Sequence, residues 1–154
     1  MDAHRVWSRA RCAAIAALGL ALALGMLGPA GGEAVATGVE VSLSTDKVVY
    51  RSGEPIAMTL RVSNHAAPET RLEFSTTQRF DFAIRDTKGG QLWRWSTDQM
   101  FGQMLGTEVL GPARPQILYR AEFTGSLSPG FYRVEGTLVA REWPLSATLV
   151  IQVQ

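Results

Sequence analysis

Hydrophobic and polar residues alternate with a period of two along most of this chain, from Val39 to the last residue. The clearest run is "IAMTLRVS" at 56–63, where every second residue is apolar and would lie on one side of an extended strand. Glycine, proline, asparagine and serine separate the runs, as they do in turns. The pattern predicts seven or eight short strands, at 39–43, 56–63, 70–74, 79–85, 91–96, 117–123, 131–139 and 147–153. That number of strands in one domain is typical of an all-β, antiparallel β-sandwich with an immunoglobulin-like outline.

One segment interrupts the alternation. Residues 97–106, "TDQMFGQMLG", have no period of two. We expect either one helical turn or a long connection between sheets in this segment.

A hairpin rich in aromatic residues precedes this interruption. Its strands, at 79–85 and 91–96, are joined by a stretch that begins with Asp and reaches Gly at its fourth residue, a good type I turn. Two registers are compatible with this turn: one sets Phe82 opposite Arg94, and the other sets Phe82 opposite Trp95. A slip of one residue moves every side chain of a strand to the other face.

The register decides what the aromatic residues of the hairpin do. In the second register Phe80, Phe82, Ile84, Trp93 and Trp95 join one core, where buried aromatics contribute strongly to stability. In the first register the two tryptophans lie on the opposite face, beside charged residues. That arrangement would favour a partner-binding surface, since Trp and Arg are enriched at interface hot spots.

The N-terminal residues have the layout of a secretory signal peptide. Three arginines precede an uncharged apolar run at 13–27, and the Ala-Val-Ala sequence that ends at Ala36 fits a signal-peptidase site. A retained membrane anchor is the competing interpretation, but the run is shorter than a spanning helix. We predict a signal peptide at 1–36 and one domain at 37–154, in a protein that is secreted or periplasmic (cell envelope).

Removing that segment leaves an electrically neutral domain without cysteine. The predicted signal peptide contains three of the 15 basic residues and two of the 14 acidic residues, so 12 of each remain. It also contains Cys12, the only cysteine. A net charge of zero argues against nucleic acid and anionic lipid as partners. We therefore expect a protein or a neutral ligand as the partner, and membrane contact only through the transient signal peptide.

The sequence shows no set of residues suited to catalysis. His65 is the only histidine of the predicted domain, and Ser126 lacks the G-x-S-x-G spacing of a hydrolase nucleophile. Glu69 and Glu73 share one face of a predicted strand, but about 13 Å would separate them, too far for paired carboxylates in glycoside hydrolysis. We predict a binding domain that is not an enzyme, with no cofactor and no metal site.

Several short motifs together resemble the bacterial intracellular proteinase inhibitor family, the BsuPI-type domain. The resemblance covers residues 39–154 and rests on Phe80-Asp81-Phe82, the turn from Asp86 to Gly89, Trp93-Arg94-Trp95-Ser96, Phe101, Pro129-Gly130-Phe131-Tyr132 and Gly136. These motif residues are expected to be mainly structural. The resemblance implies an immunoglobulin-like sandwich and inhibition of subtilisin-type serine proteinases.

Inhibition would require an exposed loop that is rigid before it binds. The segment at 97–106 offers Met100, Phe101, Met104 and Leu105, apolar side chains that would suit a subtilisin-like pocket. The alternative is that these residues close one end of the sandwich, because Met and Phe often fill irregular gaps.

A second candidate is "GPARPQ" at 111–116, where Arg114 lies between Pro112 and Pro115. Its alternative is a stiff turn between two strands, the usual role of Pro and Gly. A different class of function also stays open: an adhesion or assembly domain that binds protein or glycan without inhibiting a protease. Exposed tryptophans would favour that function, and buried tryptophans with a protruding 97–106 segment would favour inhibition.

Overall fold

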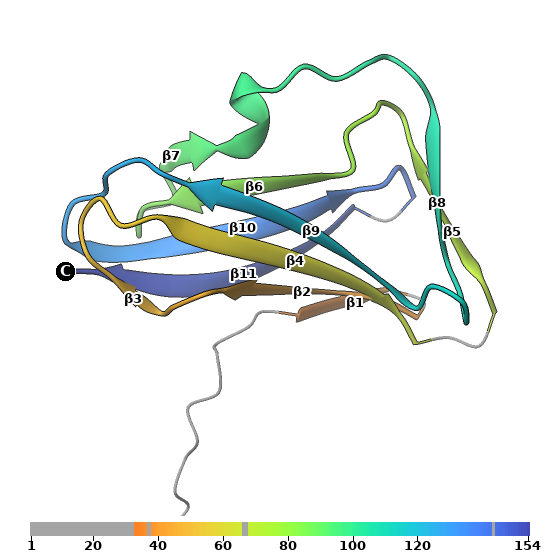
Figure 1. The fold of residues 1–154 in the computed structure, drawn as a ribbon, viewed down its shortest axis with the longest axis horizontal. Helices are drawn as coiled ribbons and strands as arrows, with labels where there is room; N and C mark the ends of the chain where they lie inside the picture. The colour runs from red at the N-terminus through yellow and green to blue at the C-terminus, as the bar shows by residue number, and fades with distance from the viewer. Residues whose placement is uncertain (1–32, 37, 66–67, 143) are drawn as a thin grey trace, which may run out of the picture.

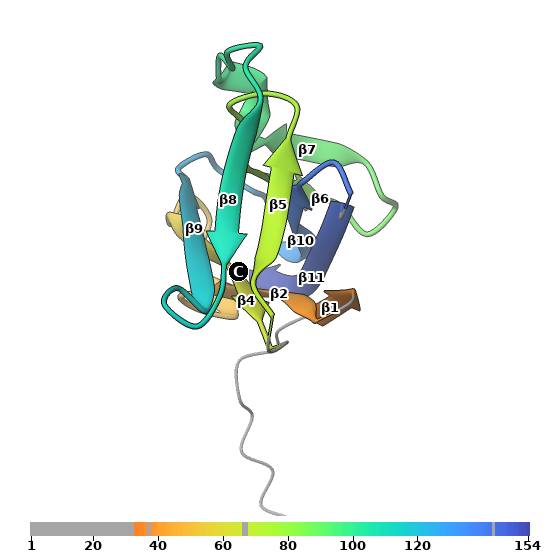
Figure 2. The same ribbon diagram turned by 90° about the vertical axis from the view of Figure 1, so that its right-hand side faces the viewer.

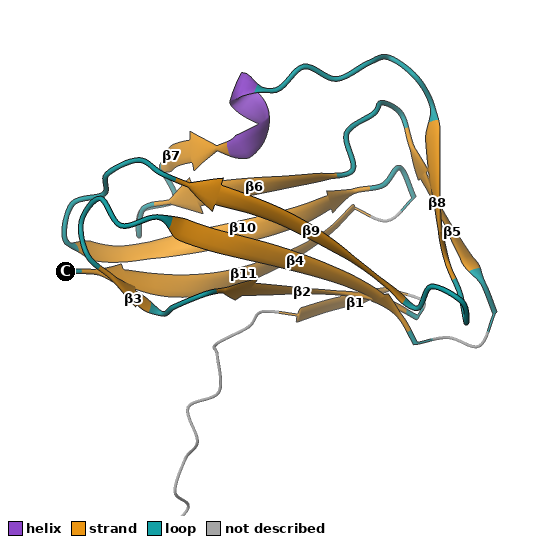
Figure 3. Cartoon of the chain, viewed as in Figure 1, coloured by secondary structure: helices purple, strands orange, loops and turns teal. Residues whose placement is uncertain are grey.

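A computed structural model describes residues 33–36, 38–65, 68–142 and 144–154, which form an all-β sandwich (Figure 1). The elements are β1 (Glu33–Ala36), β2 (Val39–Thr45), β3 (Val49–Tyr50), β4 (Ile56–Asn64), β5 (Thr70–Phe74), β6 (Phe80–Arg85), β7 (Gln91–Arg94), the 3-10 turn η1 (Trp95–Asp98), β8 (Gly106–Leu110), β9 (Gln116–Phe123), β10 (Gly130–Val139) and β11 (Pro144–Val153). Figure 3 shows that strands and their connections make up almost all of the described chain. Among the residues described, no helix has the length and hydropathy that a membrane span requires.

Two large sheets pack against each other. One has the strand order β1-β2-β4-β9 and the other β3-β11-β10-β6-β7. All pairings in them are antiparallel except the short one between β3 and β11. A separate antiparallel pair, β5 and β8, runs across one end of the sandwich (Figures 1 and 2). The predicted fold class, an antiparallel β-sandwich, is confirmed.

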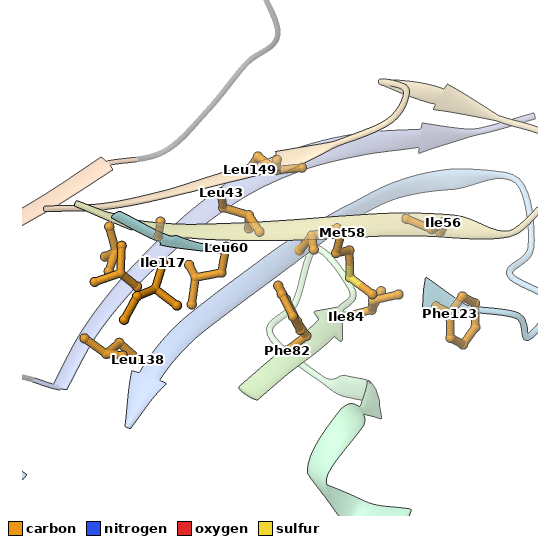
Figure 4. Close-up of a cluster of buried hydrophobic side chains, with 14 of the residues drawn as sticks. Leu43, Ile56, Met58, Leu60, Phe82, Ile84, Ile117, Phe123, Leu138 and Leu149 are labelled. Carbon is orange, nitrogen blue, oxygen red and sulfur yellow. The ribbon is translucent and has the colours of Figure 1, made fainter. Parts of the chain in front are cut away.

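Alternation along the strands produces the core between the sheets. In β4 the four predicted inward residues, from Ile56 to Val62, are each at most 1% exposed, while Ala57 and Arg61 face solvent. Side chains from both sheets meet around Met58, Leu60 and Phe82 (Figure 4). Because neighbouring side chains of a strand point to opposite faces, this pattern of burial follows directly from the sequence.

The described residues form eleven strands, more than the seven or eight predicted, and three of them were missed. β3 has only two residues and is too short to show a period. β8 begins at the end of the interrupted segment, which contains both expected features: η1 provides the helical turn, and the residues after it connect to β8. β1 lies inside the predicted signal peptide, whose residues 1–32 are outside the described residues. Cleavage after Ala36 would remove β1, which pairs with β2 from Glu33 to Ala36.

The hairpin adopts the second of the two registers. Ile84 pairs with Trp93 and Ala83 with Arg94, and a bulge between Ile84 and Arg85 adjusts the turn. The strand ends at Arg94, so Trp95 begins η1. Phe82 and Ile84 are buried, and Phe80, Trp93 and Trp95 are half-buried against the same core. The aromatic residues of the hairpin therefore form a core and not a separate binding face.

Candidate functional site

The most exposed large apolar side chains lie on one connection, residues 99–105, which we call the exposed segment. Met100 is 100% exposed, Met104 67% and Leu105 73%; these three residues are called the apolar tip below. The segment links η1 to β8 and lies along the upper margin of the molecule in two perpendicular views (Figures 1 and 2). Three water-exposed apolar side chains on one short segment are typical of an interaction site.

Backbone hydrogen bonds hold both sides of Met100. The N–H of Gln99 donates to the carbonyl of Ser96 (3.2 Å), and Gln99 itself is extended. Gly102 makes two bonds to Thr77 of the β5–β6 loop: its N–H donates to Thr77 Oγ1 (2.9 Å), and its carbonyl accepts from the Thr77 N–H (3.0 Å). The exposed segment is thus fixed to the domain on either side of its most exposed residue.

Phe101 points the other way from its neighbour Met100. It is half-buried, with its ring centroid 6.0 Å from that of Trp95. Trp95 in turn stacks on Phe80 (4.4 Å), and Phe80 stacks on Tyr119 (4.8 Å). This aromatic column connects the exposed segment to the core. Phe101 therefore anchors the segment, and the other three predicted apolar residues, the tip, face solvent.

Asp81 forms the polar base of the site. Its carboxylate is buried beside β7 and accepts four hydrogen bonds: from the N–H of Phe82 (2.9 Å), Arg94 Nη1 (3.0 Å), the N–H of Ser96 (3.1 Å) and Ser96 Oγ (2.7 Å). Charge-assisted bonds of this kind are stronger than neutral ones. They hold the end of β7 and the start of η1 against β6. The "FDF" and "WRWS" motifs thus meet at one carboxylate.

Two further motif residues, Gly130 and Tyr132, lie at the start of β10. Gly130 begins β10 and pairs with Val153 next to the C-terminus. The hydroxyl of Tyr132 donates to the carbonyl of Ser128 (2.7 Å) and closes the turn before β10. Their place in the fold is consistent with the structural role expected of them.

Arg114 does not lie with the apolar tip. It belongs to the turn between β8 and β9, at the opposite end of β8 from the exposed segment (Figure 1). Gly111 and Arg114 exchange two backbone hydrogen bonds (3.1 and 2.9 Å), and Arg114 Nη1 pairs with Glu108 Oε2 at 2.8 Å. The structure thus places the two predicted contact regions apart, and only the first presents free apolar side chains.

Potential chemistry elsewhere is sparse. His65 Nε2 lies 2.9 Å from a carboxylate oxygen of Glu40, in an exposed position. Within the ranges that the structure describes, no group of three or more His, Cys, Asp and Glu residues could hold a metal ion. The exposed segment is therefore the candidate site, and it is suited to binding.

Two tyrosines should make the stability of the fold sensitive to alkaline pH. Burial, with the nearby charge of Glu108, raises the pKa of Tyr119 to about 12. Burial, with the hydrogen bond to Asp46, raises the pKa of Tyr50 to about 12. Both ionise near pH 10 in an unfolded chain, so their contribution to stability is present below pH ~10 and lost as pH rises through ~12. We expect the free energy of unfolding, measured with denaturant, to fall across this interval.

The variant Tyr119→Phe separates the two tyrosines. The Tyr119 hydroxyl is buried without a hydrogen-bond partner among the described residues, whereas Tyr50 donates to Asp46 Oδ1 at 2.7 Å. Tyr119→Phe should raise the free energy of unfolding at neutral pH by about 1 kcal/mol, and the control Tyr50→Phe should lower it by about 1 kcal/mol. Equal losses in both variants would contradict this account of Tyr119.

Similar folds occur among solved structures. The C-terminal domain of Wzt matches with a TM-score of 0.51 and 10% identity, over 80% of this chain and 78% of that domain. The sporulation control protein Spo0M from Bacillus subtilis matches with a TM-score of 0.50 and 14% identity, over 77% of this chain. This chain spans 50% of the length of Spo0M. At these identities the similarity concerns the fold alone, and no curated protein matches the sequence.

A family model described as "Intracellular proteinase inhibitor", BsuPI, matches residues 43–143. This range contains every motif residue on which the resemblance rests, from Phe80 to Gly136. The description of the family as intracellular contradicts our prediction of a secreted or periplasmic protein, which is wrong. The physical basis of that prediction was an apolar run in residues 13–27, and such a run does not by itself determine where a protein resides. Because the family model matches about two thirds of its length, the chain belongs to the BsuPI family of intracellular proteinase inhibitors.

Proposed function

We propose that this protein is a non-catalytic inhibitor of subtilisin-type serine proteinases and that the exposed segment is its contact with the enzyme. Membership of a proteinase inhibitor family supports a proteinase as the partner. The observation that carries the proposal is Met100, fully exposed on a backbone that is hydrogen-bonded on both sides. A segment ordered before binding loses little conformational entropy on association, which favours affinity.

The chemistry of the tip supports an apolar pocket as its target. All three side chains are uncharged, and Met is unbranched and flexible enough to fill a pocket of irregular shape. Burying one such side chain in an apolar pocket contributes about 1.5–3 kcal/mol. The tip therefore suits a proteinase whose substrate pockets are apolar.

The alternative function, adhesion or assembly without inhibition, depended on exposed tryptophans. Trp93 lies 5.4 Å from Phe123 in an edge-to-face contact, and Trp95 stacks on Phe80. Both are half-buried against the core. This arrangement, together with the exposed segment, favours inhibition over adhesion.

A titration of the full chain into subtilisin tests the proposal. We expect residual activity to fall to near zero at close to one inhibitor per enzyme, because the complex of an ordered loop dissociates slowly. The variant in which Met100, Met104 and Leu105 are all alanine should bind at least ~100-fold more weakly, since it lacks the side chains that would fill the pockets. Arg114→Ala is the control, because it removes a side chain at the other end of β8 and should inhibit like the wild type. Full activity at a large excess of the wild-type chain would overturn the proposal.

A further inference from the structure

The three residues of the apolar tip are not equivalent. Met100 is bracketed by anchors: the backbone of Gln99 is bonded to Ser96, and Phe101 packs on Trp95. Met104 and Leu105 lie between the Gly102–Thr77 pair and the start of β8. Only Met100 therefore has a side chain whose position is defined by neighbours on both sides.

The direction of the Met100 side chain follows from that of Phe101. Successive side chains of an extended chain point to opposite faces, and Gln99 starts the segment in an extended conformation, with φ −108° and ψ 149°. Phe101 is turned inward onto the aromatic column, so Met100 is turned outward, which agrees with its complete exposure. A fully exposed apolar side chain that follows an extended residue, on a backbone held on both sides, has the form of a substrate residue presented to a proteinase.

We infer that Met100 is the specificity-determining residue, the one that enters the primary pocket of the proteinase, and this inference rests on the proposed function. The partner is then an enzyme with a deep, uncharged primary pocket that accepts a long unbranched side chain. A pocket that carries a carboxylate at its base, as in trypsin, would leave that charge unpaired against the thioether. The structure thus assigns selectivity between these enzyme classes to one side chain.

Replacement of Met100 by lysine tests this assignment directly. Lysine is also unbranched and similar in length, but its ammonium suits an acidic pocket and is costly to bury in an apolar one. In the full chain, Met100→Lys should weaken inhibition of subtilisin at least ~30-fold and strengthen inhibition of trypsin at least ~30-fold. The comparison variant, Met104→Lys, makes the same change in the same segment but outside the primary pocket. It should weaken inhibition of subtilisin at least ~5-fold less than Met100→Lys does, and it should not strengthen inhibition of trypsin.

The site of slow cleavage provides a second readout. If a complex with subtilisin is kept until the inhibitor is cut, hydrolysis should fall at the peptide bond between Met100 and Phe101. In that step the hydroxyl of a water molecule joins the carbonyl carbon of Met100, and its proton goes to the nitrogen of Phe101. Mass spectrometry of the two fragments identifies the bond.

The outcomes separate the inference from the proposed function. A switch in selectivity with Met100→Lys alone, together with cleavage after Met100, supports the inference. Equal effects of the two lysine variants, or cleavage elsewhere in the segment, overturn the role of Met100 and leave inhibition by the segment standing. Absence of inhibition by the wild-type chain overturns both. Both positions are exposed, so a thermal melt that matches the wild type shows that a loss does not arise from unfolding.

Discussion

Replacement of Asp81 by alanine should lower the free energy of unfolding by about 3 kcal/mol, because it removes a buried carboxylate that accepts several hydrogen bonds, one of them from a partly exposed arginine. The carboxylate is the common acceptor for Arg94 Nη1, the Ser96 N–H and the Ser96 hydroxyl. Its loss leaves these donors without their acceptor in a partly dehydrated site. The end of β7 and the start of η1 should then separate from β6. Chemical denaturation followed by circular dichroism measures the effect.

Two further variants make the Asp81 result specific. Asp98→Ala makes the same chemical change at an exposed position of η1 and should alter stability by no more than about 0.5 kcal/mol. Asp81→Asn keeps the shape and one acceptor oxygen but presents an amide to Arg94. Its free energy of unfolding should therefore lie between those of the wild type and Asp81→Ala. The substitution should also weaken inhibition in conditions where the variant is folded, because η1 leads directly into the exposed segment. A loss below about 1 kcal/mol for Asp81→Ala would show that the carboxylate does not hold the hairpin.

Replacement of Phe82 by alanine should also lower the free energy of unfolding by about 3–5 kcal/mol, as expected for a buried aromatic truncated to a methyl group. Phe82 is 1% exposed and lies in the middle of the core (Figure 4). It makes an edge-to-face contact with Phe80, with centroids 5.5 Å apart. The β-sandwich has little freedom to fill the cavity, because strands of both sheets are already paired around it.

The Phe82 ring has room in the core because residue 136, opposite it, is a glycine. The two residues pair across β6 and β10. A Cβ atom at Gly136 would lie 3.3 Å from Cε1 of Phe82 and 3.0 Å from Cδ1 of Leu60, both tight contacts. The ring therefore fits closely against a backbone without a side chain, so its removal leaves a cavity that neighbouring groups cannot fill.

The matched control for Phe82 is Phe131→Ala on the outer face of β10. Phe131 is 57% exposed, so the same chemical change should cost less than about 1 kcal/mol. Phe82→Leu should cost less than Phe82→Ala, since leucine retains more of the buried volume. Similar losses for the two alanine variants would contradict the placement of Phe82 in the core.

The period of two along the sequence was sufficient to predict most of the strands and the inward-facing residues. In β4 and β10, whether a side chain is buried follows from its parity along the strand, a local property that the chain carries without reference to its neighbours. The same local information predicted the turn from Asp86 to Gly89 and the break in the pattern after Ser96, whereas in the structure the strand already ends at Arg94. It also predicted Met100, Met104 and Leu105 as candidates for contact, because apolar residues in a segment without periodicity have no assigned core face.

The alternation did not reveal β1, because residues 33–36 follow an apolar run and were predicted to be the end of a signal peptide. An apolar run preceded by arginines has the same charge and hydropathy whether or not it acts as an export signal. The intracellular description of the family was needed to correct the location, and the pairing of β1 with β2 was visible only in three dimensions.

Tertiary structure alone decided the register of the hairpin, the anchor of the exposed segment and the polar base of the site. The turn sequence is compatible with both registers. The observed one packs Trp93 against Phe123 of the core. Gly102 meets Thr77 across 25 residues of sequence, and Ser96 meets Asp81 across 15. Contacts at such separations depend on how whole strands pack, which no local periodicity encodes. The sequence by itself therefore determined which side chains are buried, and the packing of the sheets determined which exposed side chain is held in place to bind.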